Sequence, residues 1–396
     1  MIKEKLVNSY VRLFGKNIND CHFYFAPGRV NLIGEHIDYN GGHVFPYAII
    51  KGTYLLARKR SDDRIRLFSL NIKRDPFIYE SLYYDEKIDP NNKWVNYPKS
   101  TITMVRKAGY KINSGFDLIY YGNIPGSGLS SSASIEVVIA LMLDDLFNLN
   151  IDKKEMAKIC QSVENVCYGL KTGIMDQFSV IFGKKDNAIF LDCSNLEYEY
   201  APLNLGKYKI VVTNSNLIHT LASSKYNERK QQCEEALADL NKVVKLNNLC
   251  ELTPEQFNSY KDYIKDDTCK KRAKFVVEEE ARTKAALASL KANDFDSFIT
   301  YINASGKGLK DEYEATAEQI DYLVEESLSY PFCVASRMTG GGWGGNIIAI
   351  VESDKIKEYE ERLCYSYKKK FDIDTKANVL SCADGARKLD NDLFWN

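Results

Sequence analysis

The chain carries the sequence Gly126-Ser127-Gly128-Leu129-Ser130-Ser131-Ser132-Ala133-Ser134 directly ahead of a long apolar stretch. A loop of small residues that opens into a helix is typical of a phosphate-binding site. Glycines let the backbone approach an anion, and the first helical N–H groups have no intrahelical acceptors. The adjacent serines add hydroxyls that can bind phosphate or a hard cation. The alternative interpretation is an ordinary helix cap, since serine is a favoured N-cap residue.

The residues on both sides of this loop favour the phosphate-binding interpretation. Residues 135–147 are apolar almost all round, which predicts a buried helix with a rigidly held N-terminus. Residues 116–124 read as a strand that leads into the loop. The loop is not a Walker-type P-loop, because the pattern Gly-x-x-x-x-Gly-Lys-Ser/Thr is absent from the sequence. The His-Arg-Asp and Asp-Phe-Gly motifs of protein kinases are absent as well.

The size of the chain indicates two domains. Its 396 residues, 45% of them hydrophobic, provide material for two cores. We expect domains at 1–200 and 201–396, in an α+β architecture with helices packed on mixed sheets. The sequence pattern predicts strands at 23–25, 52–59, 64–69, 116–121, 188–192, 208–213 and 347–351, and helices at roughly 219–245, 254–264, 270–291 and 310–328.

Charge and composition exclude several classes of function. A net charge of −1 predicts no basic surface for nucleic acid or for a membrane. The chain has no apolar stretch long enough for a membrane span and no signal-peptide core at its start, so we expect a cytosolic protein. The ten cysteines form no Cys-x-x-Cys motif, which indicates reduced thiols. The four histidines lack metalloprotease spacing, so we expect any metal to be hard and oxygen-bound.

Two acidic residues lie in apolar surroundings after the serine loop. A helix predicted to begin at Asp152 places Glu164 at the edge of a buried stripe, where a carboxylate is costly unless it is paired or binds a cation. For a single residue the simpler interpretation is a glutamate turned to water. Asp176 follows within Gly173-Ile174-Met175-Asp176-Gln177-Phe178. Two acids near one phosphate-binding loop suggest that one holds Mg2+ and the other faces a hydroxyl nucleophile.

A third polar segment lies near the start of the chain. It reads Ala26-Pro27-Gly28-Arg29-Val30-Asn31-Leu32-Ile33-Gly34-Glu35-His36-Ile37-Asp38-Tyr39-Asn40-Gly41-Gly42. Its acidic, imidazole and amide side chains suit a polyol, because sugar hydroxyls need fixed donors and acceptors. By pattern alone the segment could equally be a polar surface turn, and Arg29 a structural ion-pair partner.

Together these segments resemble the galactokinase family, part of a superfamily that also contains homoserine, mevalonate and phosphomevalonate kinases. Residues 28–42 look like the galactokinase signature, and residues 126–134 match the ATP motif of the superfamily. The run Arg337-Met338-Thr339-Gly340-Gly341-Gly342-Trp343-Gly344-Gly345 resembles its third motif, and the similarity continues through 224–229. The resemblance implies a ribosomal-protein-like N-terminal domain and a ferredoxin-like C-terminal domain, with the active site between them. It also implies ATP-dependent phosphorylation of the anomeric hydroxyl of galactose, with Mg2+.

The resemblance implies a role for each site residue. Asp176 would be the catalytic base, and Arg29 would stabilise the transferred phosphoryl group and keep Asp176 ionised. The sugar would be bound by Glu35, His36, Asp38, Gly173 and Tyr226. The ATP phosphates would be bound by Gly126, Ser127, Gly128, Leu129, Ser130, Ser131 and Ser132, with a weaker match at Ser69 for the nucleotide. Mg2+ would be held by Ser132 and Glu164.

Two kinds of alternative to a galactose kinase remain open at the level of sequence, a kinase with another acceptor and a non-catalytic sensor. Ile37 and Trp343 depart from the residues most common in the family, which leaves the sugar preference open. The acceptor could be N-acetylgalactosamine, another sugar or mevalonate, although the cluster Glu35, His36 and Asp38 argues against mevalonate. The chain could also be a non-catalytic galactose sensor, but the intact serine motif and both acids favour an active enzyme. We expect a monomer whose partners are galactose and ATP.

Overall fold

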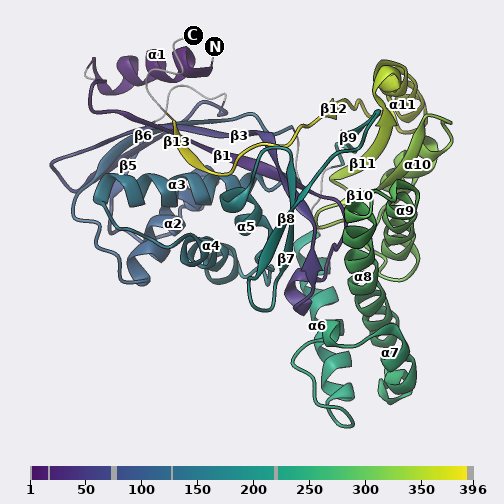
Figure 1. Ribbon diagram of the computed structural model, residues 1–396. Coiled ribbons are helices and arrows are strands. Elements are labelled where there is room, and N and C mark those ends of the chain that lie inside the picture. Colours follow the sequence, from purple (N-terminus) through teal and green to yellow (C-terminus); the bar gives the residue numbers. More distant parts are fainter. Residues whose placement is uncertain (1, 17, 73–77, 126–127, 218–221, 390–396) are drawn as a thin grey trace.

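The computed structural model describes residues 2–16, 18–72, 78–125, 128–217 and 222–389. Its largest sheet is mixed, with all neighbouring strands antiparallel except β4 and β6. The strand order is β13 (Arg387–Leu389), β1 (His22–Asn31), β3 (Pro46–Lys59), β6 (Phe116–Gly122), β4 (Arg64–Ser69) and β5 (Tyr79–Leu82). Because β13 comes from the end of the chain and pairs with β1, the sequence returns to the first sheet after building the second (Figure 1).

Helices cover both faces of this sheet (Figure 1). One face is covered by α1 (Ile2–Phe14), whose Leu6 and Tyr10 pack against Phe23 and Leu56 of the sheet. The other face carries α2 (Asn96–Lys107), α3 (Ser131–Phe147), α4 (Lys153–Ser162) and α5 (Met175–Phe182). Helix α3 is buried along most of its length, as its apolar sequence predicts, so its N-terminus is held by the core.

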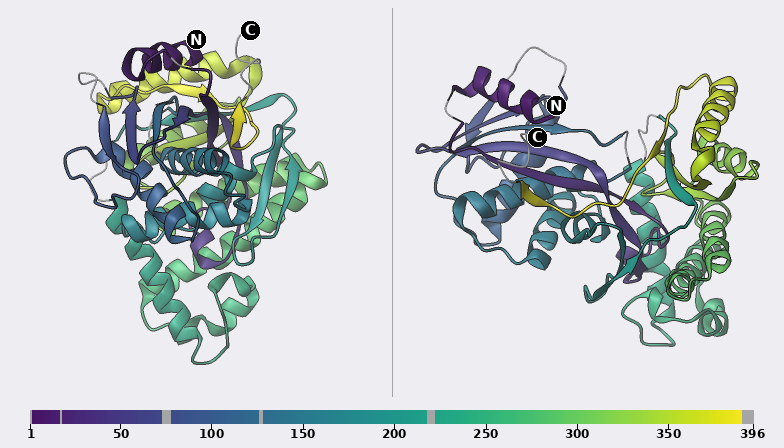
Figure 2. Two further views of the ribbon diagram at one scale, coloured as in Figure 1. Left: turned by 90° about the vertical axis from the view of Figure 1, so that its left-hand side faces the viewer. Right: turned by 45° about the horizontal axis from the view of Figure 1, so that its top comes forward.

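The second large sheet is fully antiparallel and lies in the other half of the molecule (Figure 2). Its order is β10 (Cys333–Thr339), β11 (Asn346–Glu352), β9 (Tyr208–Asn214) and β12 (Ala377–Val379). Successive residues of a strand point to opposite faces. Val211 therefore packs in the cluster of Tyr359, while Val212 packs in the cluster of Phe298.

The remaining elements connect and enclose these sheets. The helices of this half are α6 (Ala222–Leu240), α7 (Pro254–Tyr260), α8 (Asp267–Lys291), α9 (Phe295–Asp311), α10 (Glu318–Leu328) and α11 (Ile356–Phe371). A small sheet of β2 (His43–Val44), β7 (Asn187–Asp192) and β8 (Tyr198–Pro202) lies between the two larger ones (Figure 1). Short turns of helix occur at η1 (Asp38–Asn40), η2 (Lys93–Val95), η3 (Val163–Cys167), η4 (Leu249–Glu251), η5 (Lys261–Tyr263) and η6 (Ser353–Lys355).

The α+β fold is confirmed, but one predicted helix is wrong. A single helix was expected at 310–328, but α9 ends at Asp311 and α10 begins only at Glu318. Tertiary contacts stabilise the break, because Arg229 donates to the carbonyl of Tyr313 and the Trp343 indole donates to the carbonyl of Glu314. Helices α1, α2, α5 and α11 and most of α9 were not expected from the sequence.

Two further observations bear on the expectations from composition. No helix among the described residues combines the length and the apolar character needed to cross a lipid bilayer. The ten cysteines, all in the described part of the chain, form no disulfide. The division into domains at residue 200 stays a prediction.

Candidate active site

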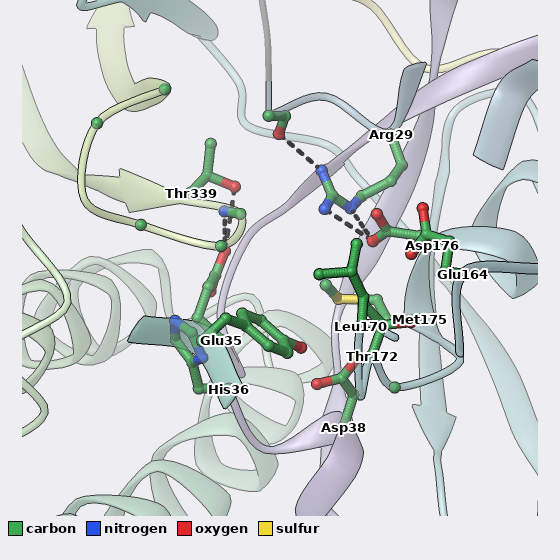
Figure 3. Close-up of a pocket in the computed structure, with 18 residues that line it drawn as sticks. Arg29, Glu35, His36, Asp38, Glu164, Leu170, Thr172, Met175, Asp176 and Thr339 are labelled. Carbon is green, nitrogen blue, oxygen red and sulfur yellow. Dashed lines mark hydrogen bonds and ion pairs between the residues drawn. The ribbon is translucent and has the colours of Figure 1, made fainter. Parts of the chain in front are cut away.

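One cavity of about 330 Å³ gathers most of the residues singled out by the sequence (Figure 3). Of those residues, the cavity is lined by Arg29, Glu35, His36, Asp38, Gly128, Glu164, Gly173, Asp176 and Tyr226. Its other walls are formed by Leu170, Thr172, Met175, Thr339, Gly340, Gly341, Gly342, Gly344 and Gly345. The three motifs, which are far apart in the chain, therefore meet around one space.

Strand β1 aims Arg29 at this cavity. The pairing of β1 with β3 shifts between Pro27 and Arg29, and such a bulge re-aims the side chains that follow it. The Arg29 guanidinium is buried, and its Nε and Nη2 atoms each lie 2.7 Å from Oδ1 of Asp176. Nη1 donates to the carbonyl of Gly128 at 3.0 Å, so Arg29 connects the catalytic-base candidate to the serine loop. Figure 3 shows this pair across the cavity from Glu35 and His36.

The described part of the serine loop presents an open helix N-terminus. Gly128 has φ +85° and Ser130 has φ 59°, and α3 begins at Ser131, whose side chain is exposed. The Ser130 side chain makes no cap hydrogen bond, and its hydroxyl is buried without a partner in the described structure. The helix-cap interpretation is therefore wrong for Ser130, and the first N–H groups of α3 remain open to an anion.

The glycine-rich turn after β10 packs against this loop. A Cβ at Gly340 would lie 2.8 Å from the Gly128 carbonyl, and one at Gly128 would lie 3.1 Å from Nδ2 of Asn346. Gly340 also has φ +90°, which a side chain would strain. The turn needs glycine because two backbone segments approach each other here.

Glu164 lies in the π-helical turn η3 that continues α4. Such turns are frequent at functional sites. The Glu164 side chain is buried, so the interpretation as a surface glutamate is wrong. The Ser132 hydroxyl donates to Glu164 Oε1 at 2.7 Å. Burial raises the pKa of Glu164, and this is the environment in which a carboxylate gains from a cation.

Glu35 is held by the third motif. Its carboxylate is fully buried and paired with Arg337, whose side chain is also fully buried. The Thr339 hydroxyl and the Gly340 N–H both donate to Oε1, at 3.1 and 3.2 Å. A carboxylate has about four acceptor positions, so one remains for a substrate hydroxyl.

His36 and Asp38 form the adjoining wall. Burial, with a smaller contribution from the charge of Arg229, lowers the pKa of His36 to about 3, so its ring is neutral. Burial and the nearby charge of Asp176 raise the pKa of Asp38 to about 6. A Cβ at Gly173 would lie 2.1 Å from Oδ2 of Asp38, so only glycine fits beside this carboxylate.

Several predicted nucleotide residues lie outside the cavity wall. Leu129 is buried in the hydrophobic core beneath the loop, and Ser130, Ser131 and Ser132 lie at the start of α3. Ser69 ends β4 and accepts from the Asn71 N–H at 3.4 Å, so its contact with the nucleotide stays a prediction. Gly126 and Ser127 lie outside the described residues.

No role was predicted from the sequence for Arg337, Thr339 or Thr172. Thr172 and Thr339 line the cavity, and Arg337 holds Glu35 from behind it. Arg337 and Thr339 belong to the third motif, so the motif itself was the available signal. Thr172 precedes Gly173 directly, but nothing in its type indicated a contact with the cavity.

Comparisons with known proteins define the class. The family described as "Galactokinase galactose-binding signature" matches residues 8–59. "GHMP kinases N terminal domain" matches 96–184, and "GHMP kinases C terminal" matches 286–369. The fold and the cavity are thus those of a GHMP kinase.

Relatives narrow the class further. A galactokinase of Clostridium acetobutylicum is 46% identical over 390 residues, covering 98% of each chain. A galactokinase of Fusobacterium nucleatum is 45% identical over 391 residues, covering 98% of this chain and 99% of the relative. The crystal structure of Lactococcus lactis galactokinase complexed with galactose superposes with a TM-score of 0.95 at 39% identity, covering 98% of this chain and all of that one. The chain belongs to the galactokinase family.

Mevalonate kinase of Methanococcus jannaschii shares the fold alone, with a TM-score of 0.61 at 19% identity and coverage of 92% of this chain and 99% of that one.

Proposed function

We propose that this protein transfers the terminal phosphoryl group of ATP to the anomeric hydroxyl of galactose, giving galactose 1-phosphate and ADP. Membership of the galactokinase family supports the activity and both substrates. The observation that carries the assignment within this chain is the ion pair of Arg29 and Asp176, which faces the cavity beside the open N-terminus of α3. The cytosolic location and the monomeric state expected from the sequence stay predictions.

The chemistry follows from the arrangement of these groups. Phosphoryl transfer passes through a loose, highly charged transition state, so positioning and charge neutralisation supply most of the catalysis. Asp176 accepts the proton of the anomeric hydroxyl as that oxygen bonds to the terminal phosphorus and the bond to ADP breaks. Arg29 orients the Asp176 carboxylate and offsets negative charge on the transferred group. The N–H groups at the start of α3 bind the phosphates.

The sugar site is assigned to the opposite wall. Asp38 and Glu35 accept hydrogen bonds from sugar hydroxyls, and His36 adds a neutral ring nitrogen. Gly173 leaves room for the Asp38 carboxylate, and the Tyr226 ring packs 5.3 Å from the His36 ring to close the wall. A site with several fixed polar groups discriminates strongly against acceptors that leave them unpaired.

The residues at η3 and α3 fit Mg2+. Glu164 is a buried carboxylate on the cavity wall, burial raises its pKa, and the Ser132 hydroxyl donates to it at 2.7 Å. Mg2+ prefers one or two such protein oxygens together with substrate phosphates. Ser132 and Glu164 would hold the ion, which when bound neutralises phosphate charge. The described residues contain no group of three or more His, Cys, Asp or Glu side chains that could hold a metal ion.

The test is a direct assay with a panel of acceptors. Purified protein with ATP and Mg2+ is given galactose, N-acetylgalactosamine, glucose and mevalonate in turn, ADP release is followed, and the product is identified by 31P NMR. We expect galactose to give the largest kcat/KM and a product phosphorylated at the anomeric oxygen. ADP release without a sugar phosphate, or no turnover with any acceptor, would contradict the proposal and favour a sensor.

A further inference from the structure

One wall of the cavity comes from a loop whose two ends lie side by side. Backbone hydrogen bonds of 3.1 Å, from the Leu32 N–H to the Phe45 carbonyl and from the Phe45 N–H to the Ile33 carbonyl, close residues 34–43 into a loop. Three cavity residues belong to this 34–43 loop (Figure 3), namely Glu35, His36 and Asp38. The position of the loop therefore decides where these three side chains lie in the cavity.

The first end of the 34–43 loop is bound by Glu279 of helix α8. The Gly34 N–H donates to Glu279 Oε1 at 2.9 Å, and the Ser305 hydroxyl donates to the same oxygen. Arg282 Nε donates to the other oxygen, Oε2, at 2.9 Å. The Glu279 side chain is fully buried, and a buried carboxylate is stable only when it is paired and hydrogen-bonded. These partners therefore fix the carboxylate that accepts from Gly34.

The second end is bound by Glu280, the next residue of α8. The His43 N–H donates to Glu280 Oε2 at 2.7 Å, and Nδ1 of the His43 ring lies 2.7 Å from Oε1. The Lys284 amine also lies 2.7 Å from Oε1. Burial opposes ionisation of Glu280, but the hydrogen bonds from His43 and Lys284 lower its pKa below the usual value. The ionised carboxylate only accepts hydrogen bonds, so both the backbone and the ring of His43 donate to it.

The two carboxylates can bind both ends because these ends are adjacent. Successive residues of an α-helix are about 100° apart around its axis, so Glu279 and Glu280 point in different directions. A Cβ at Gly34 would lie 2.6 Å from the His43 carbonyl oxygen, so the two ends of the loop are in contact. A Cβ at Gly42 would lie 2.9 Å from Oε2 of Glu280, so the backbone of the loop packs on this carboxylate as well. Helix α8 therefore crosses the loop where it begins and ends.

We propose that Glu279 and Glu280 are positioning residues that hold the two ends of the 34–43 loop and thereby set the affinity of the cavity for the acceptor sugar. Neither side chain lines the cavity, so both act through the loop. Binding groups need a supporting set of contacts that holds them to within about 0.5 Å. The part of this proposal that concerns the sugar rests on the proposed function, whereas the part that concerns the loop applies to the free protein.

Hydrogen exchange in the free protein tests the contacts with the loop. Exchange is followed by mass spectrometry with electron-transfer fragmentation, which resolves single amides. We expect the Gly34 and His43 amides to be protected in the wild type. Glu279→Ala should speed exchange at Gly34, and Glu280→Ala at His43, each by at least about tenfold, because an N–H bonded to a charged acceptor loses its partner. Fast exchange at both amides in the wild type, or unchanged exchange in both variants, would overturn the proposal.

Steady-state kinetics test the consequence for the sugar. We expect Glu279→Ala and Glu280→Ala each to raise KM for galactose about 5- to 50-fold, with KM for ATP within about twofold, because a misplaced loop weakens only the contacts it makes. Glu279→Gln and Glu280→Gln keep an oxygen that can accept from the Gly34 or the His43 N–H, so KM should return to within about threefold of the wild type. An unchanged KM in the alanine variants, or an equal rise in the glutamine variants, would overturn the proposal. If Glu279→Ala does not fold, the two Glu280 variants decide the question.

Asp117→Ala is the matched control. Asp117 is also a fully buried carboxylate, and it accepts from Arg66 at 2.6 and 2.8 Å and from Arg60 at 3.0 Å, but it does not line the cavity. We expect this variant to lose stability and to keep both KM values, and a raised KM for galactose would show that KM follows stability alone and would overturn the proposal.

Failure of this inference and failure of the proposed function are distinguishable. The expected exchange pattern in a protein without kinase activity would contradict only the proposed function. A protein that phosphorylates galactose with a KM that the alanine variants leave unchanged would contradict only this inference.

Discussion

Replacing Asp176 with asparagine separates the chemical role of this side chain from its structural role. Asparagine is nearly isosteric with aspartate, so it can occupy the same space at the start of α5, but it cannot accept the proton of the anomeric hydroxyl. Proton transfer by a positioned side chain is typically worth 10²–10⁴-fold. We therefore expect Asp176→Asn to lower kcat by about 10²–10⁴-fold, which corresponds to about 2.7–5.4 kcal/mol of transition-state stabilisation.

The effect on folding should be much smaller. The side chain of Asp176 is 26% exposed but that of Arg29 only 4%, and the side-chain oxygen of asparagine can still accept a hydrogen bond from Arg29, so the buried guanidinium keeps a partner. Exchanging a charged acceptor for a neutral one in this hydrogen bond costs about 1 kcal/mol, and the loss of a negative charge in the first turn of α5 adds up to about 1 kcal/mol. We expect the free energy of unfolding in urea to fall by no more than about 2 kcal/mol.

The chain offers a matched control in Asp145. Its side chain is 28% exposed, much like that of Asp176, and pairs with the Lys388 amine at 2.7 Å, so Asp145→Asn removes the charge of a similarly exposed aspartate that does not line the cavity. ADP release is measured at saturating galactose and ATP for both variants, together with urea unfolding. Asp145→Asn should lose a similar amount of stability and keep kcat. If Asp176→Asn retained more than about a tenth of the wild-type kcat, Asp176 would not be the base.

Two other variants and two changes of condition test the rest of the site. Gly173→Ala places a Cβ against the Asp38 carboxylate, so KM for galactose should rise at least about tenfold while KM for ATP stays unchanged. Steady-state kinetics with each substrate varied measure both constants, and a rise in both would contradict the assignment of Gly173 to the sugar site. The pKa of Asp38 is raised to about 6, so its ionised carboxylate, which accepts hydrogen bonds from the sugar, is lost as pH falls through that value. We therefore expect kcat/KM for galactose to drop about tenfold per pH unit below about 6. A flat pH profile down to pH 5 would count against Asp38 as a sugar ligand. The same raised pKa means that the folded protein binds more protons than the unfolded one between about pH 4 and 6, so the contribution of Asp38 to stability falls as pH rises through this window, which urea unfolding against pH can check. Chelation of Mg2+ with EDTA should abolish turnover. Glu164→Gln should raise the Mg2+ concentration for half-maximal activity about 10- to 100-fold. An unchanged Mg2+ dependence in this variant would show that Glu164 does not bind the metal.

Features that depend on short stretches of chain are the ones that the sequence predicts best. The glycines and serines of residues 126–134 predict a phosphate-binding loop because backbone conformation and helix N-termini follow from neighbouring residues. The apolar run 135–147 predicts the buried helix α3 for the same reason. The break between α9 and α10 was missed because distant side chains, those of Arg229 and Trp343, hold the carbonyls that a continuous helix would use.

The sequence did not determine whether a single acidic side chain is buried or which groups it contacts, because both depend on packing. A glutamate at the edge of an apolar stripe can turn to water or inward, and only the π-helical turn at η3 places Glu164 beside Ser132 on the cavity wall. Likewise, nothing in the third motif indicated that Arg337 would be fully buried against Glu35. Burial depends on which elements pack together, and the sequence pattern of one element does not contain that information.

By itself, the sequence determined the class of fold, the family resemblance and the identity of the chemical groups, because glycine loops, apolar helices and motif residues are local properties. Only the tertiary structure decided how these groups meet. Arg29 and Asp176 are 147 positions apart and form an ion pair, and Glu35 and Arg337 are 302 positions apart and share a buried contact. Tyr39 and Tyr313 are 274 positions apart, and their hydroxyls lie 2.7 Å from each other. Such contacts depend on the packing of whole sheets and helices, which is a cooperative property of the folded chain and is not encoded in any one segment.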